Sequence, residues 1–195
     1  RVAYSADLGH ARVDDEVAHR VADAVQAISD LGCVVEAVDP PFASDGPDLA
    51  RFFWSAYELP WARFLPEWEE RMDPGLVACI REAEGRSLDE YLVMRERKLA
   101  YVEQWQRFFE DWDLLLTPSV SVAAFPAERL QPEHWPTHDW DWLMWAQFSY
   151  PFNLSGQPAA SIPCGFTKAG LPVGLQIVAA RHEDLRVLQA SAAFE

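Results

Sequence analysis

The sequence is poor in basic residues, with 16 lysines and arginines against 31 aspartates and glutamates and a formal net charge of −15. Proteins that bind nucleic acid need a basic surface that displaces counterions from phosphates, so this composition argues against a nucleic-acid partner. It also argues against attraction to an anionic membrane. No apolar run approaches the ~20 residues that cross a bilayer, and no signal peptide opens the chain. We therefore expect a cytoplasmic protein with no membrane partner.

Cysteine is rare, and glycine never occurs in pairs. The three cysteines, Cys33, Cys79 and Cys164, lie far apart and form no CxxC motif, so the sequence indicates neither a zinc ribbon nor a disulfide framework. No GxGxxG or Walker-type loop is present, which argues against a phosphate-binding cradle. We predict no metal and no cofactor.

The remaining composition is that of a globular protein, with 50% hydrophobic and 24% charged residues in a chain of 195. The chain opens at Arg1 within a strand pattern and closes at Glu195 within a helical pattern. We therefore expect these residues to be part of a longer polypeptide.

Apolar periodicity predicts an α/β fold with a mainly parallel mixed sheet flanked by helices. Strands are predicted at 2–5, 33–38, 114–118, 159–166 and 173–179, the last two joined by a turn at 167–170. Helices are predicted at 14–31, 48–71 with interruptions, from 74, 87–111, 139–149 and from 183. The first strand, helix and strand predict a βαβ unit with parallel strands.

The helix over 87–111 opens with a capping box made by Ser87 and Glu90. The side chains predicted to share one apolar side of this helix are Leu88, Leu92, Leu99, Val102, Trp105 and Phe109. Residues 119–138 are predicted to be irregular, and 150–158 to be rich in turns.

Few residues form a pattern typical of catalysis or metal binding. Ser155 is the only serine followed by glycine, but no histidine lies near it in sequence to act as a base, which favours a turn or pocket-wall role. Cys164 lies in an apolar strand, as buried structural thiols do. His134 and His138 have a metal-ligand spacing, yet Pro136 opposes the continuous helix that would bring both imidazoles to one face.

Tryptophans are concentrated in one segment. Trp135, Trp140, Trp142 and Trp145 fall within eleven positions, beside several carboxylates. Such a cluster is typical of core packing, of the wall of an apolar substrate pocket, or of a sugar-binding cleft.

Four stretches of the chain resemble a known family. The segments FNLSGQPAASIPCGFT at 152–167 and GLPVGLQIV at 170–178 closely resemble the C-terminal signature of the amidase signature family. The strand DLLLTP at 113–118 and the opening RVAYSADLG at 1–9 also resemble that family, with Ala6 where proline is usual. The resemblance runs in order through the whole chain.

The resemblance implies amide hydrolysis by a Ser–cis-Ser–Lys triad through an acyl-enzyme, within the amidase signature fold. The Gly-Gly-Ser-Ser-Gly stretch of that family and its upstream lysine are absent from the sequence, so we assign no catalytic residue. Residues 1–195 are then expected to be the C-terminal portion of a single amidase domain, inactive alone, that supplies scaffold and pocket wall.

The predicted substrate-binding residues are Thr117, Trp142, Trp145, Asn153, Ser155 and Gly156. Thr117 and the 153–158 turn are chosen because they end strands or form turns, where ligands of α/β proteins lie. The tryptophans are expected to favour aromatic or bulky apolar substrate groups. The expected partners are a small-molecule amide, the N-terminal part of the same protein, and further copies of the chain, since a separated half exposes sheet edges and apolar patches.

Two other functions stay open. The first is a glutaminase subunit of the kind that serves the tRNA-dependent amidotransferase and passes ammonia to a partner. The second is a non-catalytic binding module that uses the aromatic and acidic cluster, for example for sugars.

Overall fold

The computed structural model describes residues 1–195, apart from the side chain of Leu143. Five strands form one sheet in the order β2-β1-β3-β5-β4. Their bounds are β1 (Val2–Tyr4), β2 (Val35–Ala37), β3 (Leu114–Pro118), β4 (Ala159–Phe166) and β5 (Pro172–Val178). β1 runs parallel to β2 and β3, whereas β5 is antiparallel to β3 and β4. The predicted α/β fold with a mixed sheet flanked by helices is confirmed, but the sheet is not mainly parallel, because two of its four strand pairings are antiparallel.

The parallel half of the sheet is the predicted βαβ unit. Helix α1 (Asp15–Asp30) connects β1 to β2 and buries apolar residues that recur at helical spacing: Val17, Val21, Ala24, Val25 and Ile28. Gly32 follows the helix with a φ of +98°, a left-handed backbone conformation that glycine adopts without steric cost.

The antiparallel half follows from a short connection. The Thr167 N–H donates to the Leu171 carbonyl (2.8 Å) and closes the predicted turn between β4 and β5. So tight a turn joins only antiparallel neighbours. The two signature segments are therefore adjacent strands of one hairpin.

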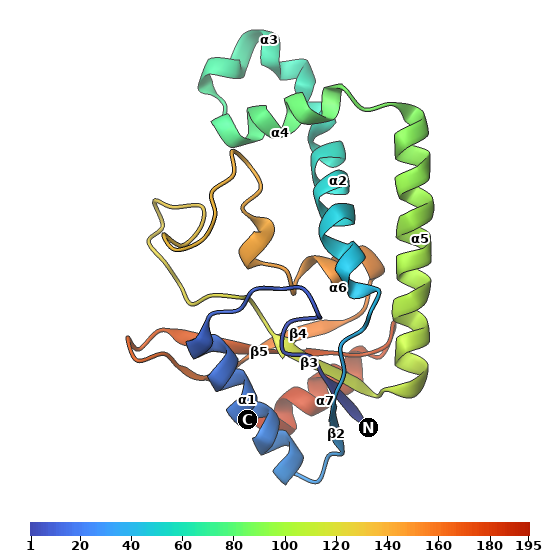
Figure 1. Ribbon diagram of the computed structural model, residues 1–195, viewed down its shortest axis with the longest axis vertical. Coiled ribbons are helices and arrows are strands. Elements are labelled where there is room, and N and C mark those ends of the chain that lie inside the picture. Colours follow the sequence, from blue (N-terminus) through green and yellow to red (C-terminus); the bar gives the residue numbers. More distant parts are fainter.

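Helices cover both faces of the sheet (Figure 1). On one face, α1 and α7 (Asp184–Phe194) pack against alternate residues of the strands, such as Leu116 and Ile177. On the other face, α2 (Gly46–Glu58), α5 (Leu88–Asp111) and α6 (Tyr150–Ser155) bury the intervening residues, such as Leu115 and Val178. The remaining helical elements are η1 (Ala43–Asp45), η2 (Leu59–Phe64), α3 (Leu65–Trp68), η3 (Glu69–Arg71), α4 (Pro74–Glu84) and η4 (Leu143–Trp145).

Helix α5 is only partly buried. Its capping box is present as predicted, with the Ser87 side chain accepting from the Glu90 N–H. The predicted apolar side is wrong for the first half of the helix, where Leu88, Leu92 and Leu99 are 71%, 44% and 60% exposed. The reason is position: this half extends beyond the sheet toward α4, and only the second half lies beside the core (Figure 1).

The tryptophan-rich segment differs most from expectation. The predicted helix over 139–149 is wrong, because this stretch is irregular apart from the short η4. Indole N–H groups anchor it to other parts of the chain: Trp140 Nε1 donates to Glu82 (3.0 Å) and Trp145 Nε1 donates to the Leu130 carbonyl (2.9 Å). The turn-rich prediction for 150–158 is wrong over α6, which ends at Gly156 with a φ of +75°.

Among the residues that the structure describes, no helix is long and apolar enough to cross a membrane.

Candidate functional site

A line of polar side chains crosses one face of the sheet. Thr117 of β3 lies opposite Gln176 of β5, which lies opposite Ser161 of β4, so the three side chains project to the same face. Ser119 comes two residues after Thr117 and points the same way. We call Thr117, Ser119, Ser161 and Gln176 the polar row.

The polar row is buried at one end and accessible at the other. The Gln176 amide Nε2 donates to Thr117 Oγ1 (3.0 Å), and the Thr117 hydroxyl donates to the Pro118 carbonyl (2.9 Å). Both side chains are buried. The Ser119 and Ser161 hydroxyls lie 2.7 Å apart, with Ser119 half-buried and Ser161 exposed. Since one hydroxyl of this pair donates to the other, the second O–H is free to donate to a ligand oxygen.

Gly174 makes room for the serine pair. A Cβ atom at this position would lie 2.7 Å from Ser119 Oγ and 2.8 Å from Ser161 Oγ. Any side chain at 174 would therefore push the two hydroxyls apart. The arrangement of the polar row therefore requires glycine at position 174.

The tryptophan-rich segment is tied by two hydrogen bonds to the polar row and to the chain that follows β3. The second N–H of Gln176 Nε2 donates to the Phe148 carbonyl (2.9 Å). The Ser121 N–H donates to the Trp145 carbonyl (3.0 Å). The segment therefore crosses the carboxyl end of β3, where ligand sites of α/β proteins lie.

Three indoles form a wall beside this segment, which we call the tryptophan wall: Trp54, Trp142 and Trp145. Trp142 and Trp145 are stacked, with ring centroids 5.6 Å apart and planes 29° apart. Trp54 of α2 meets Trp142 edge to face at 5.7 Å. Sequence reasoning found two members of the wall, but Trp54 is remote in the chain.

A cavity of about 220 Å³ lies beside the wall, and we call it the aromatic pocket. The residues that the structure assigns to its lining include Trp54, Trp140, Trp142, Leu130, Glu58 and Asp73. Cys79 also reaches this pocket, where burial and the nearby Glu58 carboxylate raise the pKa of its thiol to about 11. The thiol is therefore protonated near neutral pH, so the two carboxylates determine the charge of the pocket.

The other predicted site residues lie elsewhere on the sheet. Ala159, the first residue of β4, pairs with Val178, which pairs with Leu115 near the start of β3. Gly156, which precedes β4, therefore lies at the end of the sheet where β3 begins. Thr117 lies toward the opposite end, where β3 finishes. The fold brings Thr117, Trp142 and Trp145 to one region and does not join Gly156 to it.

Helix α6 holds the remaining two predicted residues. Ser155 is buried, and its hydroxyl donates to the Pro151 carbonyl (2.7 Å) and contacts the Gln157 side chain. These contacts fit the turn role that the sequence favoured over a nucleophile. Asn153 is exposed on the same helix.

The metal-ligand spacing of His134 and His138 does not produce a cluster. His134 Nε2 lies 2.9 Å from an Asp14 carboxylate oxygen, while His138 Nε2 lies 3.0 Å from Arg51. No group of three or more potential ligands occurs in the part of the chain that the structure describes.

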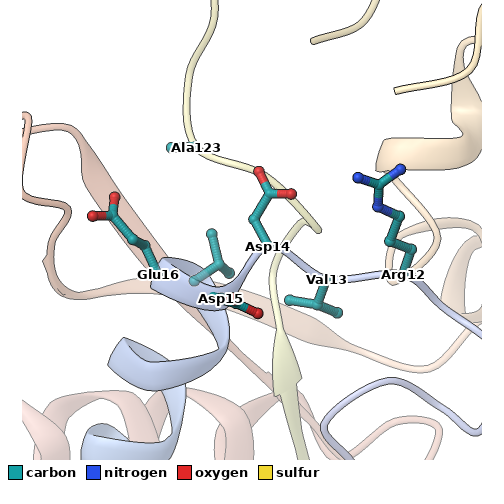
Figure 2. A pocket seen from close by; sticks show the side chains of 7 residues that line it. Arg12, Val13, Asp14, Asp15, Glu16 and Ala123 are labelled. Carbon is teal, nitrogen blue, oxygen red and sulfur yellow. The ribbon is translucent and has the colours of Figure 1, made fainter. Parts of the chain in front are cut away.

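A second hollow, of about 340 Å³, opens at the start of α1 (Figure 2). Figure 2 shows Arg12 and Glu16 on either side of Asp14. Asp14 precedes α1 but does not cap it with its side chain. Its carboxylate instead accepts from His134 and from Trp135 Nε1 (3.3 Å). The hollow is acidic and remote in sequence from the signature segments, and we assign it no function.

A sequence model described as Amidase matches residues 1–188. The chain belongs to the amidase family. An acylamidase of Rhodococcus erythropolis is 31% identical over 208 aligned residues, which cover all of this chain and 42% of that protein. A glutamyl-tRNA(Gln) amidotransferase subunit of Streptococcus thermophilus (strain CNRZ 1066) is 27% identical over 94% of this chain and 41% of its own length.

Solved structures of amidase signature enzymes share the fold. A bacterial aryl acylamidase of the amidase signature family superposes with a TM-score of 0.82 at 23% identity, over all of this chain and 42% of that one. A 6-aminohexanoate cyclic dimer hydrolase gives a TM-score of 0.82 at 25% identity, over 44% of its chain. The present chain thus spans about two fifths of the length of these relatives.

Four residues of the site region escaped sequence reasoning: Ser119, Ser161, Gly174 and Gln176. Three of them stand inside the signature segments, whose pattern indicated the family but not where each side chain lies in the fold. Only the register of β4 against β5 and of β5 against β3 places them beside Thr117.

Proposed function

We propose that this chain is the C-terminal portion of a single amidase domain that hydrolyses the carbon–nitrogen bond of small-molecule amides. The observation that carries the proposal is the position of the family's signature residues. Ser161, Gly174 and Gln176 stand on two strands of one hairpin, where Ser161 and Gln176 belong to the polar row, Gly174 makes room for it, and Gln176 bonds to the tryptophan-rich segment at Phe148.

The chain's own residues are proposed to bind and orient the amide. The free O–H of the Ser119–Ser161 pair suits a polar oxygen of the substrate, since a hydroxyl donates readily to a carbonyl or carboxyl group. Trp142 and Trp145 are proposed to pack against an aromatic or bulky apolar substituent. Thr117 is proposed to act through Gln176, because its hydroxyl is already engaged.

Asn153, Ser155 and Gly156 remain proposed substrate-side residues, acting through the shape of the turn that ends α6. Gly156 adopts a left-handed conformation beside the Arg181 guanidinium, and a Cβ at 156 would lie 3.5 Å from Arg181 Nε. The turn therefore holds the backbone close to a cationic side chain.

The chemical step is expected from the family resemblance. A serine attacks the amide carbonyl carbon, the amine leaves as the carbon–nitrogen bond breaks, and water then hydrolyses the acyl-enzyme ester. The nucleophile is proposed to come from the part of the domain outside residues 1–195. We expect these 195 residues alone to release no amine.

A surface on the sheet's edge is proposed to receive that part of the domain. Phe166 of β4 and Leu185 and Leu188 of α7 are 62%, 67% and 62% exposed, although α7 packs against β4. Exposed apolar groups beside an edge strand favour association. If that surface stays uncovered, we expect copies of the chain to associate.

The experiment measures product release by the full-length protein from an anilide, an aliphatic amide and glutamine. We expect amine from the anilide above the uncatalysed rate. Ammonia from glutamine, increased by partner subunits, with no amine from either amide would instead support the amidotransferase role, which is named for relatives at 27% identity. Inertness toward all three, with tryptophan quenching by oligosaccharides, would support the binding module.

A further inference from the structure

We infer that the aromatic pocket is a binding site for a small organic cation, a protonated amine with an apolar body. The pocket combines three indole rings with two carboxylates in a cavity of about 220 Å³. Aromatic faces attract cations through the ring quadrupole, and carboxylates add a charge partner. The pocket contains no residue of the polar row but shares Trp54 and Trp142 with the tryptophan wall, so the inference adds a cationic ligand to the wall that the proposed function assigns to the amide.

The indoles present faces in more than one direction. The planes of Trp54 and Trp142 are 84° apart, so they form a corner of the pocket. Trp145 is stacked on Trp142 and supports its ring. Trp54 is 40% exposed, which leaves the corner accessible from solvent.

Trp140 already binds a cation within the protein. The Arg51 guanidinium carbon lies 4.9 Å from the centroid of the Trp140 ring, and the indole Nε1 of Trp140 is held by Glu82. Arg51 is paired with Glu82 (3.0 Å) and Asp141 (3.2 Å). Its charge is therefore shared with two carboxylates that do not belong to the pocket lining.

The charge inside the pocket is negative. Glu58 is half-buried and forms no ion pair within the part of the chain that the structure describes. Asp73 uses Oδ1 to accept from the Leu76 N–H (2.9 Å), which leaves its second oxygen available. No lysine or arginine belongs to the described lining of the pocket. A neutral ligand would use the aromatic surfaces but not this charge.

Contacts within the chain hold the walls of the pocket in place. A Cβ at position 75 would lie 3.0 Å from the Asp139 carbonyl oxygen, so Gly75 allows the tryptophan-rich segment to approach the start of α4. Trp145 Nε1 holds Leu130 through its carbonyl (2.9 Å). Such preorganisation lowers the entropic cost of binding.

The test compares two probes of equal shape on the full-length protein by titration calorimetry: phenethylammonium and its neutral analogue 2-phenylethanol. We expect saturable binding of the ammonium and at least about fivefold weaker binding of the alcohol. Glu58→Gln keeps the shape of the side chain and should remove most of this preference, while Trp54→Leu should weaken ammonium binding by about fivefold or more.

The matched control is Trp61→Leu, an exposed tryptophan of η2 that contacts Phe64, and it should leave binding unchanged. Thermal unfolding of each variant shows that it is folded. Equal affinity for the two probes, an unchanged preference in Glu58→Gln, or no saturable binding would overturn the inference. Because the readout is binding, these outcomes are independent of whether the protein hydrolyses amides.

Discussion

The Gln176 side chain is predicted to hold the tryptophan-rich segment on the sheet, and Gln176→Leu tests this role. Gln176 is 8% exposed, and its amide nitrogen donates to Thr117 Oγ1 (3.0 Å) and to the Phe148 carbonyl (2.9 Å). Leucine has a similar volume but donates no hydrogen bond. The substitution therefore removes both contacts without opening a large cavity.

The expected cost follows from these two bonds. Each contributes about 1 kcal/mol net, and a buried carbonyl left without a donor costs about 1–3 kcal/mol. The added apolar side chain offsets about 1 kcal/mol. We expect the free energy of unfolding to fall by about 2–4 kcal/mol in urea titrations of the full-length protein. Displacement of the segment that carries Trp145 should also lower kcat/KM for an anilide by about tenfold or more.

Two comparisons make this prediction specific. Gln189→Leu changes the same residue type at an exposed position of α7 and should shift the unfolding free energy by less than about 0.5 kcal/mol. A double-mutant cycle with Thr117→Val should give a coupling energy of about 0.5–1.5 kcal/mol. A loss no larger than that of Gln189→Leu, or additive effects of the two changes, would refute the reasoning.

Three further substitutions or modifications test other parts of the structure. Gly174→Ala forces a methyl group against the serine hydroxyls, so it should lower the free energy of unfolding by about 1–3 kcal/mol in urea and should also lower amide turnover. Wild-type stability together with wild-type turnover would contradict the close approach. Trp105→Ala removes a fully buried indole and should lower the free energy of unfolding by about 3–5 kcal/mol. Trp61→Ala at the exposed surface should lower it by less than about 0.5 kcal/mol. Similar losses for the two variants would contradict the position of the core. At pH 8, iodoacetamide should alkylate exposed Cys33 well before Cys79, whose thiol has a pKa raised to about 11 by burial and by Glu58, and mass spectrometry of the two peptides would reveal the opposite order.

Local patterns predicted the parts of the fold that depend on neighbours in sequence. The βαβ unit follows from the spacing of Val17, Val21 and Ile28 and from the glycine at 32, all within one helix and its end. The hairpin of β4 and β5 follows from two apolar runs and a short turn. Each of these elements is determined by contacts that the sequence displays directly.

Long-range contacts decided the parts that sequence reasoning missed. The tryptophan-rich segment has helical spacing, but its indoles bond to Glu82 and Leu130, and these contacts replace the helix. Leu88 has the spacing of a core residue, yet the end of α5 on which it stands lies beyond the core. The spacing of apolar residues along one helix does not predict how long a neighbouring element is or where the core ends.

The candidate site divides in the same way. Thr117 and the tryptophans were predicted because strand ends and aromatic clusters are local signals. Ser161 and Gln176 were not, because their meaning depends on the register between strands β3, β5 and β4. The family pattern indicated which segments matter, and the sheet shows which side chains of those segments share a face.

The central claim is that the tryptophan wall and the polar row form part of an amide-binding site, and Trp145→Ala tests it most directly. The measurement is kcat/KM of the full-length protein for an anilide and for a small aliphatic amide, with Trp61→Ala as the control. We predict a loss of about tenfold for the anilide and less than about threefold for the aliphatic amide, since only the aromatic substrate loses apolar contact area. Equal losses for the two substrates would contradict the account.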